Sequence, residues 1–597
     1  MGLSARRFGV LSRHDPGKGP TRYSQPVRRG EGFIPGFQSR TAQNDIIAAV
    51  ARTLGAGKKP EGQLRRRGSN LAVIEAGTGV GKSIGMSVPG LVAARSLNMP
   101  LVISSSSVVL QEQYLKKELP LLARLLPYDL NIAIAKGRGR YVCNIKLVDA
   151  VASNAQTSLA LEGRDDDPSS STDTPGAQDR SLLIELQNAL ANGTWSGDRD
   201  DWAKPIDADL WGKLSTTRHA CAGKRCSEFA TCAFYSVRRQ IKQADVIVCN
   251  HDVLLSSLDM QQGALLPDPQ RCLFLIDEGH RLPDKAIEHF GCAYSLKASR
   301  QWIKDWERTC RHCVLGMRGS VDTAAQGNAI ASNLINQTNA LLDSLSAATE
   351  FKDGIWRFSC GVIPDSLTGF VWPFFKTVQS GLALSLRLRD DILTFCDSDP
   401  ALGPLLLKEL GQYISQFEAL VSCWRLMLMQ PDADQPPIAK WIAALPDEDF
   451  QVHATPIDAA DTLSKKLWQR AGAVVIASAT LRACNSFTPF LQATGLNRYP
   501  DTATLALPSP FDYPGRARLI VPRMNSDPTH AKAHTAEIIA LLPDLMVERG
   551  VLVLFASDQQ MRAVYSGLPL DQQRRCLLQG DVPKAEMLRQ HRNRTKI

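Results

Sequence analysis

The most constraining feature of this sequence is an apolar run that leads directly into a glycine-rich loop and then into a helical pattern. The run LAVIE (71–75) is followed by AGTGVGKS (76–83), in which three glycines alternate with other residues. Backbone N–H groups of such a loop turn inward around an anion, and the helix N-terminus that follows favours negative charge. This order of elements indicates a parallel sheet covered by helices, with the loop at the carboxyl end of a strand.

Other short apolar runs support an α/β fold of this kind. Each ends in small or polar residues, as buried parallel strands do where they reach the functional edge of a sheet. A chain of 597 residues is too long for one hydrophobic core, so several domains are expected. The runs are LVISSSS (101–107), DVIVCN (245–250), CLFLID (272–277), AVVIASAT (473–480) and VLVLFAS (551–557).

The glycine-rich loop supplies the candidate nucleotide-binding residues. Lys82 would reach the β- and γ-phosphates of a nucleotide, and the Ser83 hydroxyl would hold Mg²⁺. The alternative is a glycine-rich strand–helix turn without a ligand, which the flanking strand and helix patterns disfavour. The other residues predicted to surround the phosphates are Gly77, Thr78, Gly79, Val80 and Gly81.

A carboxylate pair follows the run CLFLI and completes a candidate hydrolytic site. Asp277 would also hold Mg²⁺, and Glu278 would polarise the attacking water, in the sequence Asp277-Glu278-Gly279-His280. A carboxylate pair at this place can also serve only to cap a helix. The upstream loop favours the catalytic interpretation, with Lys82, Asp277 and Glu278 as the catalytic residues.

In this order, these motifs resemble the DinG branch of the XPD-like superfamily 2 DNA helicases, from about residue 33 to the C-terminus. EAGTGVGKS and DEGH resemble motifs I and II, and Ser478-Ala479-Thr480 resembles motif III. The resemblance implies an ATP-dependent DNA helicase. SSSSVVLQEQ (104–113) resembles motif Ia, which touches the DNA backbone in the family, and Arg40 and Gln43 resemble the adenine-sensing Q-motif. LPSPFDY (507–513) and LVLFAS (552–557) resemble the opening of the second motor domain.

Four cysteines form a candidate metal site: Cys143, Cys221, Cys226 and Cys232. Thiolates suit either a [4Fe–4S] cluster or tetrahedral zinc, and spacing alone does not choose between them. The resemblance favours the cluster, while four unrelated thiols or a vestigial domain without metal would leave the same pattern. A second pair, Cys310 and Cys313, has ligand spacing in a helical segment without another pair nearby, and we expect it to be buried.

The resemblance implies two RecA-like motor domains, the first interrupted by an iron–sulfur-type domain and a helical arch. No motif V or VI is found before Ile597, so the second motor domain is expected to be incomplete. The predicted boundaries are a flexible basic extension (1–32), motor domain 1 in three parts (33–135, 235–285 and 451–500), the iron–sulfur-type cysteine domain (136–234) with a disordered acidic loop (163–180), the arch (286–450) and motor domain 2 (501–597).

Charge and composition fit a nucleic-acid partner. The formal net charge is +9, and residues 1–32 hold seven Lys and Arg against two acidic residues. The resemblance implies single-stranded and forked duplex DNA as partners and translocation with 5′→3′ polarity. We also expect a monomer, a cytoplasmic location and no membrane span. Cations and rings near the cysteines would grip phosphates and bases, namely Lys136, Arg138, Arg140, Tyr141, Lys224, Arg225, Phe229, Phe234 and Tyr235.

Two other functions remain open from the sequence. One is a CRISPR-associated, type IV accessory DinG-like helicase that works beside a CRISPR ribonucleoprotein. The other is a non-motor protein that binds nucleic acid in a nucleotide-dependent way.

Asn250-His251, at the end of DVIVCN, resembles a family feature near the DNA path, although a turn-capping role explains it equally well.

Overall fold

The computed structural model describes residues 40–57, 69–161, 177–260, 264–430, 436–546, 551–581, 587 and 589–591. The basic extension at 1–32 and most of the predicted acidic loop (163–176) lie outside these residues. The chain forms two compact units, the first of Met1–Gln187 with Gly212–Phe511 and the second of Asn188–Trp211 with Asp512–Ile597. Each unit is described by itself below.

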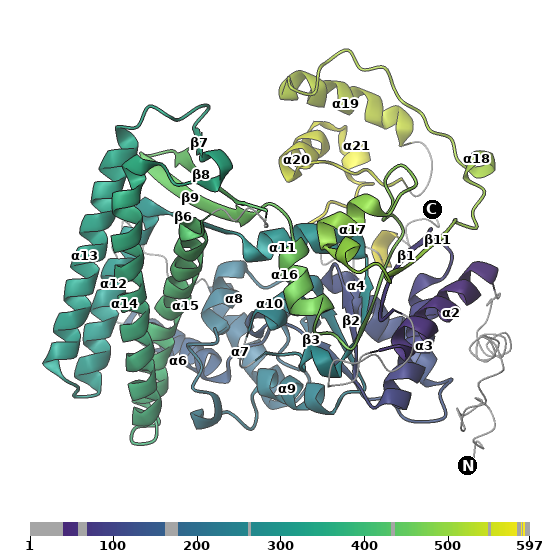
Figure 1. Cartoon of the computed structure of the whole chain (residues 1–597). Coiled ribbons are helices and arrows are strands. Elements are labelled where there is room, and N and C mark those ends of the chain that lie inside the picture. Colours follow the sequence, from purple (N-terminus) through teal and green to yellow (C-terminus); the bar gives the residue numbers. More distant parts are fainter. Residues whose placement is uncertain are drawn as a thin grey trace. The chain divides into compact units, whose positions relative to one another are not determined.

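The first unit is built on a seven-stranded sheet in which every pairing is parallel. This confirms the α/β fold expected from the apolar runs. The strand order β11-β1-β10-β5-β2-β4-β3 places segments far apart in the sequence side by side (Figure 1). The strands are β1 (Leu71–Ala76), β2 (Leu101–Ser105), β3 (Ile132–Ala135), β4 (Val246–Asn250), β5 (Leu273–Asp277), β10 (Ala473–Ser478) and β11 (Ala503–Leu507).

Helices cover both faces of this sheet because successive side chains of a buried strand point in opposite directions. In β5, Leu273 and Leu275 pack with α2 and α3, whereas Phe274 and Ile276 pack with α10 and α11. The sheet edge where the strands end is therefore the part left for polar groups. The covering helices are α2 (Thr41–Gly55), α3 (Lys82–Leu97), α10 (His251–Asp259) and α11 (Leu282–Phe290).

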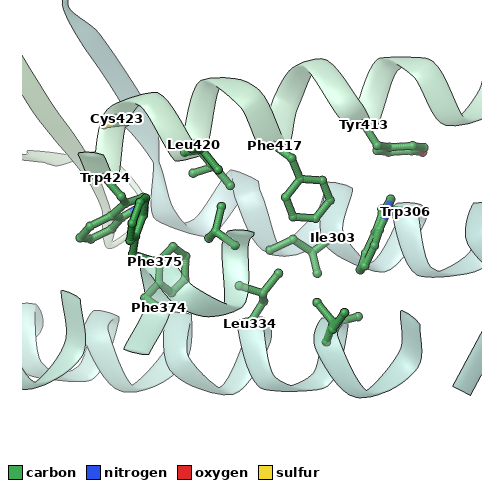
Figure 2. Packing of buried hydrophobic residues seen from close by; sticks show 14 of the residues in the cluster. Ile303, Trp306, Leu334, Phe374, Phe375, Tyr413, Phe417, Leu420, Cys423 and Trp424 are labelled. Carbon is green, nitrogen blue, oxygen red and sulfur yellow. The ribbon is translucent and has the colours of Figure 1, made fainter. Parts of the chain in front are cut away.

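Four long helices lie within residues 286–450, the segment predicted to be an arch, and their core is dense in aromatic rings (Figure 2). Phe417 makes T-shaped contacts with Trp302 and Trp306, with ring centroids 5.1 and 4.9 Å apart. A Cβ at Gly381 would lie 2.5 Å from the Phe417 ring, so only glycine admits this contact. The helices are α12 (Leu296–Gly316), α13 (Val321–Ser346), α14 (Asp365–Phe395) and α15 (Leu402–Leu428).

A four-stranded antiparallel sheet adjoins these helices, and it was not predicted from the sequence. Its order is β6-β9-β8-β7, and β8 and β9 form a hairpin whose turn holds Asp447 and Glu448 at positive φ. Such a turn is usually made by Asn-Gly or Asp-Gly, so the acidic residues hid the hairpin from sequence reasoning. The strands are β6 (Cys292–Ser295), β7 (Ile355–Arg357), β8 (Ile438–Leu445) and β9 (Asp449–Pro456).

The cysteine-bearing region is largely helical where the structure describes it. Residues 177–180 begin helix α7, so the prediction that the acidic loop extends to residue 180 is wrong for these four residues. The helices here are α6 (Asn144–Leu161), α7 (Ala177–Ala191), α8 (Ala208–Leu214) and α9 (Ala233–Gln243). Shorter helices elsewhere in the first unit are α4 (Val108–Gln113), α5 (Leu119–Ala123), α16 (Ala460–Leu463) and α17 (Thr488–Thr494).

The second unit contains helices but no strand among its described residues. The run VLVLFAS (551–557) was predicted to be a strand, and this prediction is wrong: Leu552 and Leu554 are 80% and 82% exposed. A strand forms only when a neighbour satisfies its backbone groups, and no described residue pairs with this run. The end of α7 and the start of α8 belong to this unit, and after Asp512 its described helices are α18 (Tyr513–Arg516), α19 (Ala531–Leu545), α20 (Asp558–Gly567) and α21 (Leu570–Gln573).

None of the helices in the described part of the chain combines the length and the apolar character that a bilayer crossing requires.

Arch helix α15 packs unusually closely against the loop that carries Cys221, and this generates a stability prediction. A Cβ at Gly411 would lie 2.3 Å from the Ala220 backbone nitrogen. Gly411→Ala should therefore push the helix from the loop and destabilise the protein by about 1–3 kcal/mol. Gly369→Ala is the matched control, because a Cβ there meets nothing within 4 Å. Thermal unfolding midpoints measure both, and equal midpoints for Gly411→Ala and the parent would contradict the close packing.

Candidate functional site

The predicted phosphate loop has the backbone conformation that an anion cradle needs. It connects the end of β1 to the start of α3, and Gly79 and Gly81 have φ of 83° and 86°. Residues with side chains rarely adopt this left-handed conformation, which accounts for two of the glycines. Val80 between them is buried, and Lys82 begins the helix. The structure thus brings all the predicted loop residues together at the carboxyl end of a central strand.

Two residues that sequence reasoning did not assign to this loop lie against it. The Ser509 hydroxyl donates a hydrogen bond to the Thr78 carbonyl oxygen over 2.8 Å. A Cβ at Gly77 would lie 2.6 Å from the Ser509 nitrogen, and one at Gly79 would lie 2.4 Å from the Phe511 ring. Gly77 is therefore needed for close approach, and Gly79 for close approach as well as for its positive φ. The SPF sequence after β11 was the available signal, but it resembled part of the second motor domain.

The structure separates the two residues of the predicted Q-motif. Gln43 is buried on α2 and its amide donates to the Gly81 carbonyl oxygen over 3.2 Å. It therefore contacts the loop backbone directly. Arg40 precedes the first turn of α2, and its side chain is exposed. The described contacts connect Gln43, but not Arg40, with the loop.

The buried carboxylate Asp277 ends β5, next to the end of β10. Its Oδ1 accepts the Glu278 N–H over 3.0 Å, and its Oδ2 accepts the Tyr114 hydroxyl over 2.9 Å. Burial raises the pKa of Asp277 although Lys82 lies nearby, so the charge of this carboxylate is only partly compensated. A buried carboxylate of this kind suits a divalent cation. The arrangement thus fits Mg²⁺ at Asp277.

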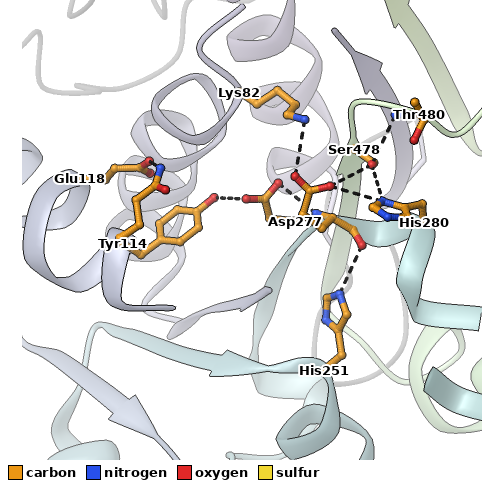
Figure 3. A network of polar contacts seen from close by, with 10 residues as sticks. Lys82, Tyr114, Glu118, His251, Asp277, His280, Ser478 and Thr480 are labelled. Carbon is orange, nitrogen blue, oxygen red and sulfur yellow. Dashed lines mark hydrogen bonds and ion pairs between the residues drawn. The ribbon is translucent and has the colours of Figure 1, made fainter. Parts of the chain in front are cut away.

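Glu278 lies at the centre of a polar network (Figure 3). Its backbone has φ 54° and ψ 41°, a strained conformation for a residue with a side chain. Its Oε1 lies 4.0 Å from the Lys82 Nζ, and its Oε2 lies 3.3 Å from both the Ser478 hydroxyl and the His280 Nδ1. Ser478 and His280 also bond to each other over 2.8 Å. The predicted motifs I, II and III therefore meet at this one carboxylate.

A buried histidine supports the strained backbone of Glu278. The His251 Nε2 lies 3.5 Å from the Glu278 carbonyl oxygen, and its Nδ1 lies 2.8 Å from the Ser104 hydroxyl. Because a carbonyl only accepts, Nε2 carries the proton and Nδ1 accepts from Ser104. Burial lowers the pKa of His251 to about 4, so the ring is neutral at physiological pH. Asn250 caps α10 by accepting the Val253 N–H over 2.9 Å, which confirms the capping alternative for this residue.

Glu75, in the strand before the phosphate loop, holds the turn that follows β10. Its carboxylate accepts the Leu481 and Arg482 N–H groups, each over 2.7 Å, and the Arg482 guanidinium over 2.8 Å. Although burial opposes ionisation, these hydrogen bonds lower the pKa of Glu75. The parallel register pairs Glu75 with Ser478, which explains why the turn passes over this carboxylate. No local pattern in the sequence announced this contact.

The four predicted cysteine ligands line one cavity, together with Arg138 and Phe229 among others. All four are free thiols, each partly exposed. In the described part of the chain, no three Cys, His, Asp or Glu side chains converge tightly enough to hold a single metal ion. The cavity brings the four predicted ligands to one place, and the metal that they would hold stays a prediction.

The charge state of these thiols is also consistent with a metal site. Burial, with the neighbouring Cys221, Cys143 and Cys232, raises the pKa of Cys226 to about 11. Burial also raises the pKa of Cys143. Without a cation these groups stay protonated at neutral pH, so metal binding would release protons.

The side chains near the cysteines that were predicted to contact DNA differ in their exposure. Lys136, Tyr141 and Phe234 are buried, so the prediction that they face DNA is wrong; the two rings pack on each other at 5.8 Å. Arg138 lies over Phe234, with its guanidinium carbon 4.0 Å from the ring centroid. The members that reach the surface are Arg140, Lys224 and Arg225, with Phe229 and Tyr235 partly exposed.

The second cysteine pair is buried, as predicted. Cys310 and Cys313 are 1% and 0% exposed on α12, inside the core of the arch. Burial raises the pKa of Cys313 to about 12, so this thiol is inert at neutral pH.

Comparison with known proteins gives consistent similarities. The family described as DEAD_2 matches residues 222–298. The chain is 33% identical over 586 residues to "ATP-dependent DNA helicase DinG" of Photobacterium profundum, covering 95% of this chain and 80% of that protein. The protein of the same name from Salmonella typhimurium is 32% identical over 583 residues, covering 94% and 78%. A solved structure titled "XPD_Helicase" aligns with a TM-score of 0.43 at 13% identity over 89% of this chain and 74% of that chain, a likeness too weak to place residues.

Exchange of Glu75 tests the contact between β1 and the turn after β10. Oε2 of Glu75 accepts both N–H groups, so Glu75→Ala removes the acceptor of both hydrogen bonds. Hydrogen exchange of the Leu481 and Arg482 amides, measured by mass spectrometry of a peptide spanning 479–487, should accelerate about tenfold. Arg482→Gln is the matched control, since it removes only the side-chain bond and should leave these amides protected. Unchanged exchange in Glu75→Ala would show that the carboxylate does not hold the turn.

Proposed function

Because the chain belongs to the DinG family of ATP-dependent DNA helicases, we propose that it hydrolyses ATP at the loop of residues 76–83 and uses the energy to move along single-stranded DNA with 5′→3′ polarity. The observation that carries this proposal is the convergence of Lys82, Asp277 and Ser478 on Glu278. A loop that only joined a strand to a helix would not need the Lys82 ammonium group, a carboxylate pair and the Ser478 hydroxyl at one point. Single-stranded and forked duplex DNA are the proposed partners.

Each residue of the site is assigned a separate role in hydrolysis. Lys82 starts α3 and neutralises charge on the transferring phosphate. Asp277 and Ser83 hold Mg²⁺, which supplies further charge neutralisation when bound. Glu278 is the general base that polarises the attacking water, and its carboxylate is aimed by Ser478 and His280. In this arrangement Gln43 positions the loop through the Gly81 carbonyl rather than through a phosphate.

The contact between Ser478 and Glu278 connects the site of hydrolysis with the turn after β10, which is proposed to respond to DNA. Ser478 accepts the Thr480 N–H over 3.4 Å, and the following turn is held by Glu75. A change at the Glu278 carboxylate during hydrolysis therefore reaches the turn through two hydrogen bonds. We assign this turn the coupling of hydrolysis to movement on DNA.

The cysteine cavity is proposed to hold a [4Fe–4S] cluster ligated by Cys143, Cys221, Cys226 and Cys232. The shared cavity and the accessible thiols support this assignment. The exposed cations nearby, Arg140, Lys224 and Arg225, would contact DNA phosphates, while Phe229 and Tyr235 would contact bases.

Variants of the phosphate loop and of the carboxylate pair test the motor assignment. Lys82→Ala should lower DNA-stimulated ATP hydrolysis by about a hundredfold or more and abolish displacement of a 5′-tailed duplex. Glu278→Gln should still bind nucleotide but not turn it over, whereas Asp277→Asn should weaken Mg²⁺ binding. The control is Lys304→Ala, an exposed lysine on α12, which should behave like the parent. Hydrolysis by Lys82→Ala at the parent rate, or unwinding from 3′ tails only, would contradict the proposal.

Iron analysis tests the cluster. Protein purified without oxygen should contain about four irons per chain, since four thiolates complete one cluster. Cys226→Ser should release iron and reduce unwinding more than it reduces nucleotide binding, because the phosphate loop lies elsewhere. Cys484→Ser, an exposed cysteine outside the cavity, should keep its iron.

Other metal contents give distinct conclusions. One zinc per chain would contradict the cluster and keep a metal-stabilised fold. Protein without metal whose Cys226→Ser variant unwinds DNA normally would indicate a vestigial domain and favour the CRISPR-associated alternative.

A further inference from the structure

The segment after β2 reaches the metal-binding carboxylate through an irregular helical turn. Helix α4 passes into a π-helical turn, Tyr114–Glu118, before α5 begins. A π turn inserts an extra residue into the helical repeat and redirects the side chains after it, and such turns are frequent at functional sites. Here the turn begins with Tyr114, whose hydroxyl points toward the carboxylate of Asp277, the last residue of β5 (Figure 3).

The Tyr114 ring packs in an apolar environment, and its hydroxyl faces the polar groups of the site. The side chain is 2% exposed and packs among the residues beneath α3 and β2. Its hydroxyl donates to the Asp277 Oδ2 over 2.9 Å. The opposite oxygen, Oδ1, is held by the Glu278 N–H. The two carboxylate oxygens are thus fixed by donors from two different elements, one of them a residue distant in sequence.

The surroundings of Tyr114 belong to the same polar site. The Ser83 hydroxyl lies near both the Tyr114 hydroxyl and the Glu118 carboxylate. Glu118, at the end of the π turn, accepts the Gln113 amide over 2.7 Å. Both proposed Mg²⁺-holding side chains, Ser83 and Asp277, therefore face residues of this one turn.

We propose that Tyr114 is a positioning residue for the Mg²⁺ site: its hydroxyl fixes the Asp277 carboxylate in the orientation that binds the metal ion. This inference rests on the proposed function, because it takes Asp277 as the carboxylate that holds Mg²⁺. Hydrogen-bond partners of metal-holding carboxylates commonly control metal affinity, since a carboxylate free to rotate must be ordered again on each binding event. A purely structural role is different, because it would affect folding without changing the response to Mg²⁺.

The test is a Mg²⁺ titration of nucleotide binding, followed by the fluorescence of an N-methylanthraniloyl ADP. Tyr114→Phe removes only the hydroxyl and keeps the ring in its apolar site. The variant should need about tenfold more Mg²⁺ than the parent for half-maximal binding, whereas binding without Mg²⁺ should be unchanged. Tyr128→Phe is the matched control, because it removes a hydroxyl that has no hydrogen-bond partner among the described residues, and it should titrate like the parent.

A double variant separates positioning from structural damage. If Tyr114 acts through Asp277, adding Tyr114→Phe to Asp277→Asn should cause no further change in the Mg²⁺ requirement. Coinciding titrations of Tyr114→Phe and the parent would overturn this inference alone, as would an equal loss in the Asp277→Asn background. A parent protein whose nucleotide binding ignores Mg²⁺ would overturn the proposed function together with it.

Discussion

The site depends on one constraint, which is that three neighbouring parallel strands end side by side. Register places Glu75 of β1 opposite Ser478 of β10, and Ala477 of β10 opposite Asp277 of β5. Parallel pairing makes all three strands run in the same direction, so their final residues gather at one edge. The phosphate loop, the carboxylate pair and the turn after β10 follow from this alignment, although 406 positions separate Glu75 from Leu481, whose N–H it binds.

Polar groups at this edge support one another because the sheet beneath them is apolar. Glu278 keeps a strained backbone, and contacts from His251, Ser478 and His280 surround it. In a low-dielectric environment each of these hydrogen bonds is stronger than in water, and an unpaired group would be costly. The same reasoning applies to Tyr114, whose buried hydroxyl is satisfied by Asp277. A residue that contacts neither phosphate nor DNA can therefore influence the chemistry of the site.

The loop that carries Cys221 packs closely against helix α15 and also forms ion pairs with the helical segment 286–450. Gly411 of α15 approaches the backbone of Ala220, directly before Cys221, and His219 bonds to Glu418 of the same helix over 2.8 Å. Arg225, between two of the cysteines, pairs with Asp397 over 3.1 Å. These helices thus support the loop that carries Cys221, Cys226 and Cys232.

Local patterns in the sequence determined the class of fold, the phosphate loop, the Asp277–Glu278 pair and the burial of Cys310 and Cys313, because spacing and flanking residues encode such features directly. They could not reveal the roles of Tyr114, Glu75 or Ser509, which arise from partners elsewhere in the chain. The run 551–557 shows the opposite error: its composition favours a strand, but a strand also needs a neighbour. Tyr141 and Phe234 likewise looked suited to DNA until packing buried them. Non-local contacts decide both burial and partnership, and only the tertiary structure contains them.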